Sequence, residues 1–106
     1  MGREQPALHY LYRQIDGMTD AARKERRAKM AGSVPRPSVE AVSRLSVRTL
    51  FLTGEEDLVV FPGSSVALAS VIPMAKVESV PRAGHSVYFE RAEAFNLAVD
   101  RFIRTL

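Results

Sequence analysis

The spacing of apolar residues in the first third of the chain predicts helices. Between Pro6 and Gly17, one helical face carries Leu8, Leu11, Tyr12 and Ile15. Proline suits the first helical turn and glycine the residue that ends a helix. A second helix, capped by Thr19 or Asp20, is predicted to continue to Ala31. Its apolar face holds only alanines and Met30, so we expect this helix to be exposed.

Residues 32–37 read Gly-Ser-Val-Pro-Arg-Pro and predict a linker. Each proline pushes the preceding residue into an extended conformation, which excludes regular structure. A short helix is predicted over 38–45, with Ser38 as its cap and Val39, Val42 and Leu45 facing inward. We therefore expect a helical segment with a Pro-rich linker over 1–37 and a second unit over 38–106.

From Val47 the pattern alternates between strand and helix. Residues 49–52 are apolar or β-branched, as in a parallel strand covered on both faces. Ser64 or Ser65 can cap a mostly buried helix that stops at Pro73, and 76–80 predict a second strand near the sheet edge. The buried residues predicted in this helix are Val66, Leu68, Ala69, Val71 and Ile72.

A final helix is predicted over 91–106, because apolar residues form one stripe along it. The stripe consists of Ala92, Phe95, Val99, Phe102, Ile103 and Leu106. The order β-α-β-α implies an α/β fold with two adjacent parallel strands. Two strands leave an edge unpaired. Either further strands come from a missing N-terminal portion of a truncated protein, or two copies pair edge to edge as a homo-oligomer.

Composition and charge narrow the class of protein. The 106 residues are 46% apolar and 25% charged, which indicates one globular domain at most. With no cysteine, no signal-peptide core and no long apolar run, we expect a cytoplasmic protein without a membrane partner. The net charge of +3 is concentrated in residues 23–29. No aromatic residue is interleaved with this cluster, so a solvated helix face is favoured over a nucleic-acid site.

Polar residues with catalytic potential follow both predicted strands. Glu55, Glu56 and Asp57 come after the first strand, and His85 comes after the second. The carboxyl ends of parallel strands meet at one sheet edge, so a carboxylate and an imidazole placed there form half of a catalytic site. The residues alone do not choose among the three carboxylates. Two histidines 76 residues apart and no cysteine predict no metal site, and nothing indicates a cofactor.

Two segments carry a resemblance to a known family. Leu-Phe-Leu-Thr-Gly-Glu-Glu-Asp-Leu-Val-Val over 50–60 resembles the strand and turn that hold the acidic triad member of α/β-hydrolases. Ala-Gly-His-Ser-Val-Tyr-Phe-Glu over 83–90 resembles their histidine loop. The resemblance covers about the last 60 residues and implies Asp57 as the acid and His85 as the general base. Less specifically, residues 1–46 resemble the end of the family's helical cap and the helix that leads back into the sheet.

The family's nucleophile lies on a G-x-S-x-G turn before the acid, and no such turn precedes Asp57. Gly-Ser-Ser-Val-Ala over 63–67 follows Asp57 without a strand feeding into it, so a helix start is the better interpretation. No HGGG-type oxyanion segment is present either. The resemblance thus implies a hydrolase acting on a small apolar substrate, with only Asp57 and His85 of its triad in this chain, which we expect to be inactive alone. The alternative is an inactive remnant that self-associates or binds.

Other residues have weaker indications. Glu90 is expected to anchor the start of the last helix, where its charge suits the helix dipole. Tyr10, Tyr12 and Phe61 are candidates either for a substrate pocket or for core packing. His9 lies beside the first helix's apolar stripe and is interpreted as a surface or packing residue.

Overall fold

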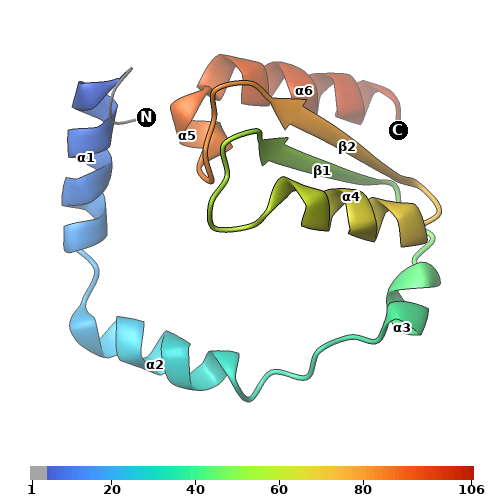
Figure 1. Cartoon of the computed structure of the whole chain (residues 1–106), viewed down its shortest axis with the longest axis horizontal. Coiled ribbons are helices and arrows are strands. Elements are labelled where there is room, and N and C mark those ends of the chain that lie inside the picture. Colours follow the sequence, from blue (N-terminus) through green and yellow to red (C-terminus); the bar gives the residue numbers. More distant parts are fainter. Residues whose placement is uncertain (1–4) are drawn as a thin grey trace. The chain divides into compact units, whose positions relative to one another are not determined.

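The computed structural model describes residues 5–106. The chain divides into two units, one that ends at Pro37 and one over Ser38–Leu106. The boundary follows Pro37, the last residue of the Gly-Ser-Val-Pro-Arg-Pro segment. The elements of both units are labelled in Figure 1.

The first unit contains α1 (Pro6–Gly17) and α2 (Ala21–Ala31), which confirms both predicted helices. Asp20 is the cap of α2, because its carboxylate accepts a hydrogen bond of 3.2 Å from the Ala22 N–H. Neither helix contains a buried residue. The exposure of α2 is as expected, whereas the apolar stripe of α1 is more exposed than an amphipathic face usually is.

The second unit begins with α3 (Val39–Ser43), where the Ser38 hydroxyl accepts a 3.2 Å hydrogen bond from the Ala41 N–H. The cap is confirmed, but the inward face is only partly right. Val42 is half-buried, while Val39 is 64% and Leu45 43% exposed. This helix of five residues has too few turns to bury a stripe.

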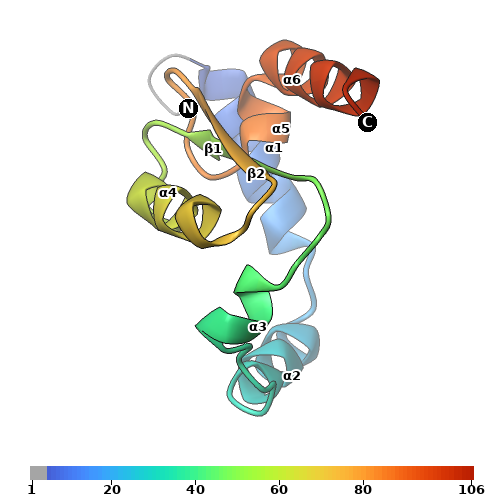
Figure 2. The same cartoon turned by 90° about the vertical axis from the view of Figure 1, so that its right-hand side faces the viewer.

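The centre of the second unit is a parallel sheet of β1 (Thr49–Gly54) and β2 (Ala75–Val80). Their register runs from Thr49 opposite Ala75 to Gly54 opposite Val80. Helix α4 (Pro62–Val71) lies on one face of the sheet and α6 (Ala92–Arg104) on the other, as the two views show (Figures 1 and 2). The predicted α/β order with adjacent parallel strands is confirmed.

Helix α4 departs from its prediction at its start and in its burial. It begins at Pro62 with Phe61 as N-cap, so neither Ser64 nor Ser65 caps it. Val66 is 58% and Leu68 43% exposed, whereas Ser65 is the buried residue of the helix. A sheet of two strands is only about 5 Å wide between strand axes. It can therefore cover only a narrow strip of a helix that is apolar on most sides.

The last predicted helix, over 91–106, is confirmed as α6, which begins one residue later and ends two residues earlier than expected. A short helix that was not predicted, α5 (Val87–Glu90), precedes α6, and Arg91 between them has non-helical backbone angles (φ −138°, ψ 57°). Within the predicted stripe, Ile103 is 58% and Leu106 72% exposed, because the packed face of α6 is rotated toward buried Ala98. No helix among residues 5–106 has both the length and the hydrophobicity needed to cross a membrane.

The core lies beneath the carboxyl ends of the strands. Val80, Ala83 and Val87 are buried together, and Leu52, Ala94 and Phe95 pack against them. This cluster joins the end of β2 to the predicted histidine loop, in which Ala83 and Val87 lie. This packing supports the loops in which Asp57 and His85 lie.

Candidate catalytic site at the carboxyl edge of the sheet

The loops that follow β1 and β2 are joined through their backbones. The Glu55 N–H donates to the Val80 carbonyl at 3.1 Å, and the Glu56 N–H donates to the Ala83 carbonyl at 2.9 Å. Gly54 permits this approach, since a Cβ there would overlap the carbonyl oxygens of Ala83 and Gly84. The glycine that ends β1 is therefore required for the two loops to meet.

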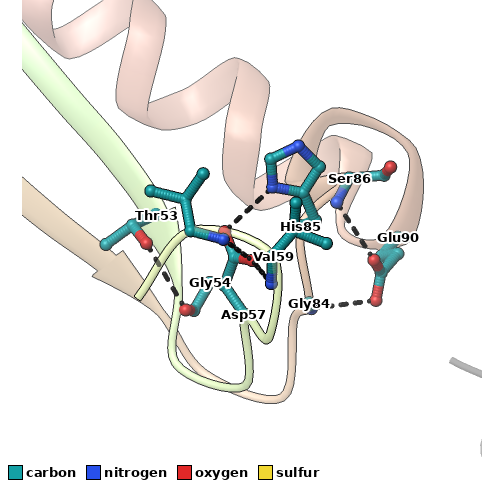
Figure 3. Close-up of polar contacts among 9 residues, drawn as sticks. Thr53, Gly54, Asp57, Val59, Gly84, His85, Ser86 and Glu90 are labelled. Carbon is teal, nitrogen blue, oxygen red and sulfur yellow. Dashed lines mark hydrogen bonds and ion pairs between the residues drawn. The ribbon is translucent and has the colours of Figure 1, made fainter. Parts of the chain in front are cut away.

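Asp57 is buried in a turn closed by its own N–H, which donates to the Gly54 carbonyl at 3.2 Å. Its Oδ1 accepts the N–H groups of Val59 at 2.8 Å and Val60 at 2.9 Å. Its Oδ2 lies 3.1 Å from Nδ1 of His85 (Figure 3). Backbone donors thus fix one oxygen of the carboxylate, and the other faces the imidazole.

The environment of Asp57 favours its ionised form. Burial alone opposes the charge, but hydrogen bonds from the Val60 and Val59 N–H groups and from the imidazole outweigh it. The pKa of Asp57 therefore lies below its ordinary value. An ionised carboxylate accepts from Nδ1–H, which leaves the lone pair of Nε2 available as a base.

The structure separates the three candidate carboxylates. Glu55 and Glu56 are exposed, whereas Asp57 is 6% exposed and contacts the ring of His85. The side chain of Asp57 points toward the histidine loop. Glu55 and Glu56 contact the segment after β2 through their backbone N–H groups, and their side chains are exposed. The proximity of Asp57 and His85 expected from the paired loops is present.

His85 combines a fixed backbone with an accessible ring. The preceding loop passes through Arg82, whose φ of 54° lies in the left-handed region, and through fully buried Ala83. The side chain of His85 is 50% exposed. Within residues 38–106, Asp57 is the side chain that forms a hydrogen bond with this ring. The imidazole is therefore oriented from the Nδ1 side and open on the other.

Glu90 has a role that sequence reasoning missed. It ends α5 instead of starting the last helix, and its buried carboxylate accepts the N–H groups of Gly84 at 3.0 Å and Ser86 at 3.2 Å. The pattern that could have revealed this is a serine followed four residues later by a glutamate, close to a capping box. Glu90 holds the backbone on both sides of His85.

The other candidates in the second unit form no side-chain hydrogen bond with this pair within residues 38–106. Ser64 is exposed and Ser65 is buried in α4, and neither is recorded in a hydrogen bond with His85. Tyr10 and Phe61 are 65% and 73% exposed. Within the described part of the chain, no cluster of His, Cys, Asp or Glu could hold a metal ion. Pocket or packing roles for the aromatic residues stay predictions.

Two cavities lie elsewhere on the second unit. They have volumes of about 400 and 230 Å³, and both are lined by Lys76 and Phe102. Neither is lined by Asp57 or His85. The first lies beside the start of β2, at the opposite end of the sheet from the pair. These two cavities are therefore separate from the Asp57–His85 pair.

The fold resembles solved structures of hydrolases. A predicted CIB-like hydrolase from Thermoplasma acidophilum matches with a TM-score of 0.62 and 32% identity over 64% of this chain and 33% of its own. The meta-cleavage product hydrolase CumD from Pseudomonas fluorescens IP01 matches with a TM-score of 0.62 and 33% identity over 65% of this chain and 25% of its own.

A third match extends further along the chain. A serine hydrolase involved in carbazole degradation, CarC, has a TM-score of 0.70 over 84% of this chain and 36% of its own, at 24% identity, which supports the fold alone. The chain thus spans a quarter to about a third of the length of these structures. No protein-family model matches the chain, and no curated protein matches it in sequence.

Proposed function

Because the chain has the fold of the C-terminal part of an α/β-hydrolase, we propose that Asp57 and His85 are the acid and base of a nucleophile-His-acid triad. The observation that carries this proposal is the 3.1 Å contact between Oδ2 of Asp57 and Nδ1 of His85. It orients the ring with Nε2 away from the carboxylate, as a general base requires (Figure 3).

In this mechanism, Nε2 of His85 removes the proton of a nucleophile as the nucleophile attacks the substrate. His85 then returns that proton to the leaving group, and a water molecule repeats the cycle to release the product. The carboxylate of Asp57 stabilises the imidazolium that exists between these steps. The low pKa of Asp57 keeps that carboxylate ionised at neutral pH.

The nucleophile of this proposal comes from outside this chain, because no G-x-S-x-G turn precedes Asp57 in the sequence. A serine on a strand-turn-helix would serve. An aspartate would attack as a carboxylate without losing a proton, and His85 would then deprotonate the water of the second step. The matched proteins above 25% identity include an esterase and a meta-cleavage product hydrolase, which favour hydrolysis as the reaction. A small, largely apolar substrate and a cytoplasmic location are part of the proposal and come from the sequence.

A chimaera tests the proposal. Residues 38–106 would replace the corresponding part of CumD, which supplies its own nucleophile, and hydrolysis of a meta-cleavage product and a simple ester would be measured. We expect activity that falls on the order of 10⁴-fold with Asp57→Asn and at least as far with His85→Ala.

The matched control is Glu55→Gln, which removes an exposed carboxylate from the same loop and should leave the rate unchanged. A chimaera that hydrolyses its substrate equally well with His85→Ala would refute the assignment. A folded chimaera without activity would also count against it.

A further inference from the structure

We propose that Glu90 is a positioning residue for His85, which it directs toward Asp57 by holding the peptide N–H groups on both sides of the histidine. The importance of this for hydrolysis rests on the proposed function. The positioning itself is a property of the folded chain and can be measured without a reaction.

The geometry is that of a two-point clamp. Oε2 of Glu90 accepts from Gly84 at 3.0 Å, and Oε1 accepts from Ser86 at 3.2 Å. Both oxygens are used as acceptors, which is the pattern of a carboxylate. Glu90 is only 7% exposed, so water competes little for these bonds. His85 is the single residue between the two clamped peptide groups (Figure 3).

A helix cap alone does not account for this arrangement. Starting α5 requires a partner for the Ser86 N–H, which one oxygen of Glu90 supplies. The Gly84 N–H lies two residues earlier, before the histidine, and satisfying it adds nothing to the helix. The second bond of Glu90 is therefore directed at the loop.

The identity of residue 84 agrees with this interpretation. Gly84 has no positive φ, so conformation does not demand glycine. A Cβ there would lie 3.1 Å from Oε1 of Glu90, which is tighter than most real Cβ contacts, and 3.4 Å from Oε2. Glycine leaves the space in which the carboxylate reaches both N–H groups.

The clamp matters because the ring of His85 is not held by packing. Half of the side chain is exposed, and its recorded polar contact is Asp57. On the acid side, the loop is fixed through the Ala83 carbonyl, which accepts from Glu56. On the helix side, it is fixed through Glu90. Loss of the Glu90 hydrogen bonds would let the loop move and lengthen the distance between Nδ1 of His85 and Oδ2 of Asp57.

The test is ¹⁵N NMR of the full chain, which reports the fraction of His85 with its proton on Nδ1. Asp57→Asn should abolish the Nδ1–H preference and defines the full effect. Glu90→Gln replaces one acceptor by an NH₂ donor, so we expect a shift toward the Asp57→Asn value. Amide exchange at Gly84 or Ser86 should quicken by about 10- to 100-fold. Glu93→Gln, an exposed carboxylate in the first turn of α6, is the control and should change neither quantity.

A Glu90→Gln protein with faster exchange, an intact sheet and an unchanged His85 tautomer would overturn the proposal, because Glu90 would then only support the helix. If that variant does not fold, Gly84→Ala displaces the same carboxylate and should shift the tautomer in the same direction. No shift in folded Gly84→Ala would equally reject positioning. An inactive chimaera would count against the triad and leave the NMR result standing.

Discussion

Apolar residues are exposed in the first unit and buried around the loops that follow the strands of the second unit. Helix α1 has a regular apolar stripe and yet none of its residues is buried. In the loops, Ala83 is fully buried and Val80 and Val87 are 5% and 4% exposed, although no periodic pattern marks them. Helical periodicity therefore determines where a helix forms, whereas burial here follows from backbone segments that meet across the sheet.

The difference has a consequence for catalysis. Asp57 and His85 lie on loops, which are usually the variable parts of a fold. Here the loops are fixed by each other, through the Glu56 to Ala83 bond and the close approach at Gly54. We therefore expect substitutions in the strand-end loops to be costly and equivalent substitutions in the first unit to be tolerated.

The largest effect is expected at the glycines. Gly54→Ala places a Cβ against two carbonyl oxygens that cannot move without separating the loops, and should cost about 3 kcal/mol of unfolding free energy. Gly17→Ala, where no atom lies within 4 Å, should change it by less than about 1 kcal/mol, in the stabilising direction. Urea unfolding followed by circular dichroism measures both. Equal losses of unfolding free energy at Gly54 and Gly17 would show that the loops of the second unit are no more tightly constrained than the first unit.

A smaller contrast is expected for apolar side chains. Val80→Ala removes two methyl groups from the buried cluster and should cost about 2 kcal/mol, since the cavity adds to the lost transfer energy. Ile15→Ala removes a larger group from α1, but that group is 53% exposed, so the change should stay within about 0.5 kcal/mol. A large loss with Ile15→Ala in the same urea titration would show that the α1 stripe is covered in solution.

Much of the fold could be predicted because its signals are local. Proline and glycine bound α1, Asp20 and Ser38 cap their helices, and the strands lie within two residues of their predicted ends. The burial of α4 could not be predicted, because its apolar residues lie on several sides of the helix and indicate a helix that is covered on all of them. The two described strands cover only one strip of it.

The candidate site was predictable in part for the same reason. Spacing and resemblance single out Asp57 and His85, and the two lie in contact. The function of Glu90 depends on where its carboxylate points after the chain breaks at Arg91, and no periodic pattern encodes that break. The residues alone did not separate Asp57 from Glu55 and Glu56, and the resemblance chose Asp57. The role of Glu90 was missed because its partners are backbone N–H groups, which a pattern of residue types does not locate.

A third contrast concerns pH. The folded state lowers the pKa of Asp57, so its stabilising contribution is fully present above the pKa of the unfolded chain, near 4. That contribution is lost as pH falls through the lower pKa of the folded state. Urea unfolding between pH 6 and pH 3 should therefore show a decline that Asp57→Asn reduces. Asp16→Asn in the first unit, where the carboxylate is 64% exposed, should leave the decline unchanged. Identical pH profiles for wild type and Asp57→Asn would contradict the stabilising environment of Asp57.

The smallest effect is expected where the two units are alike. Glu25 and Lys29 in α2 form an exposed ion pair one turn apart at 2.8 Å, and Asp100 and Arg104 in α6 do the same at 2.8 Å. Glu25→Gln and Asp100→Asn should each cost about 0.3 to 0.5 kcal/mol at low salt and almost nothing at 1 M salt. Helix content and urea unfolding would measure both losses of unfolding free energy. Equal small losses would show that exposed ion pairs contribute alike in the two units, so that the units differ in the burial of their side chains. A loss above 1 kcal/mol in α2 alone would instead show that surface charge pairs contribute to the first unit what buried side chains contribute to the second.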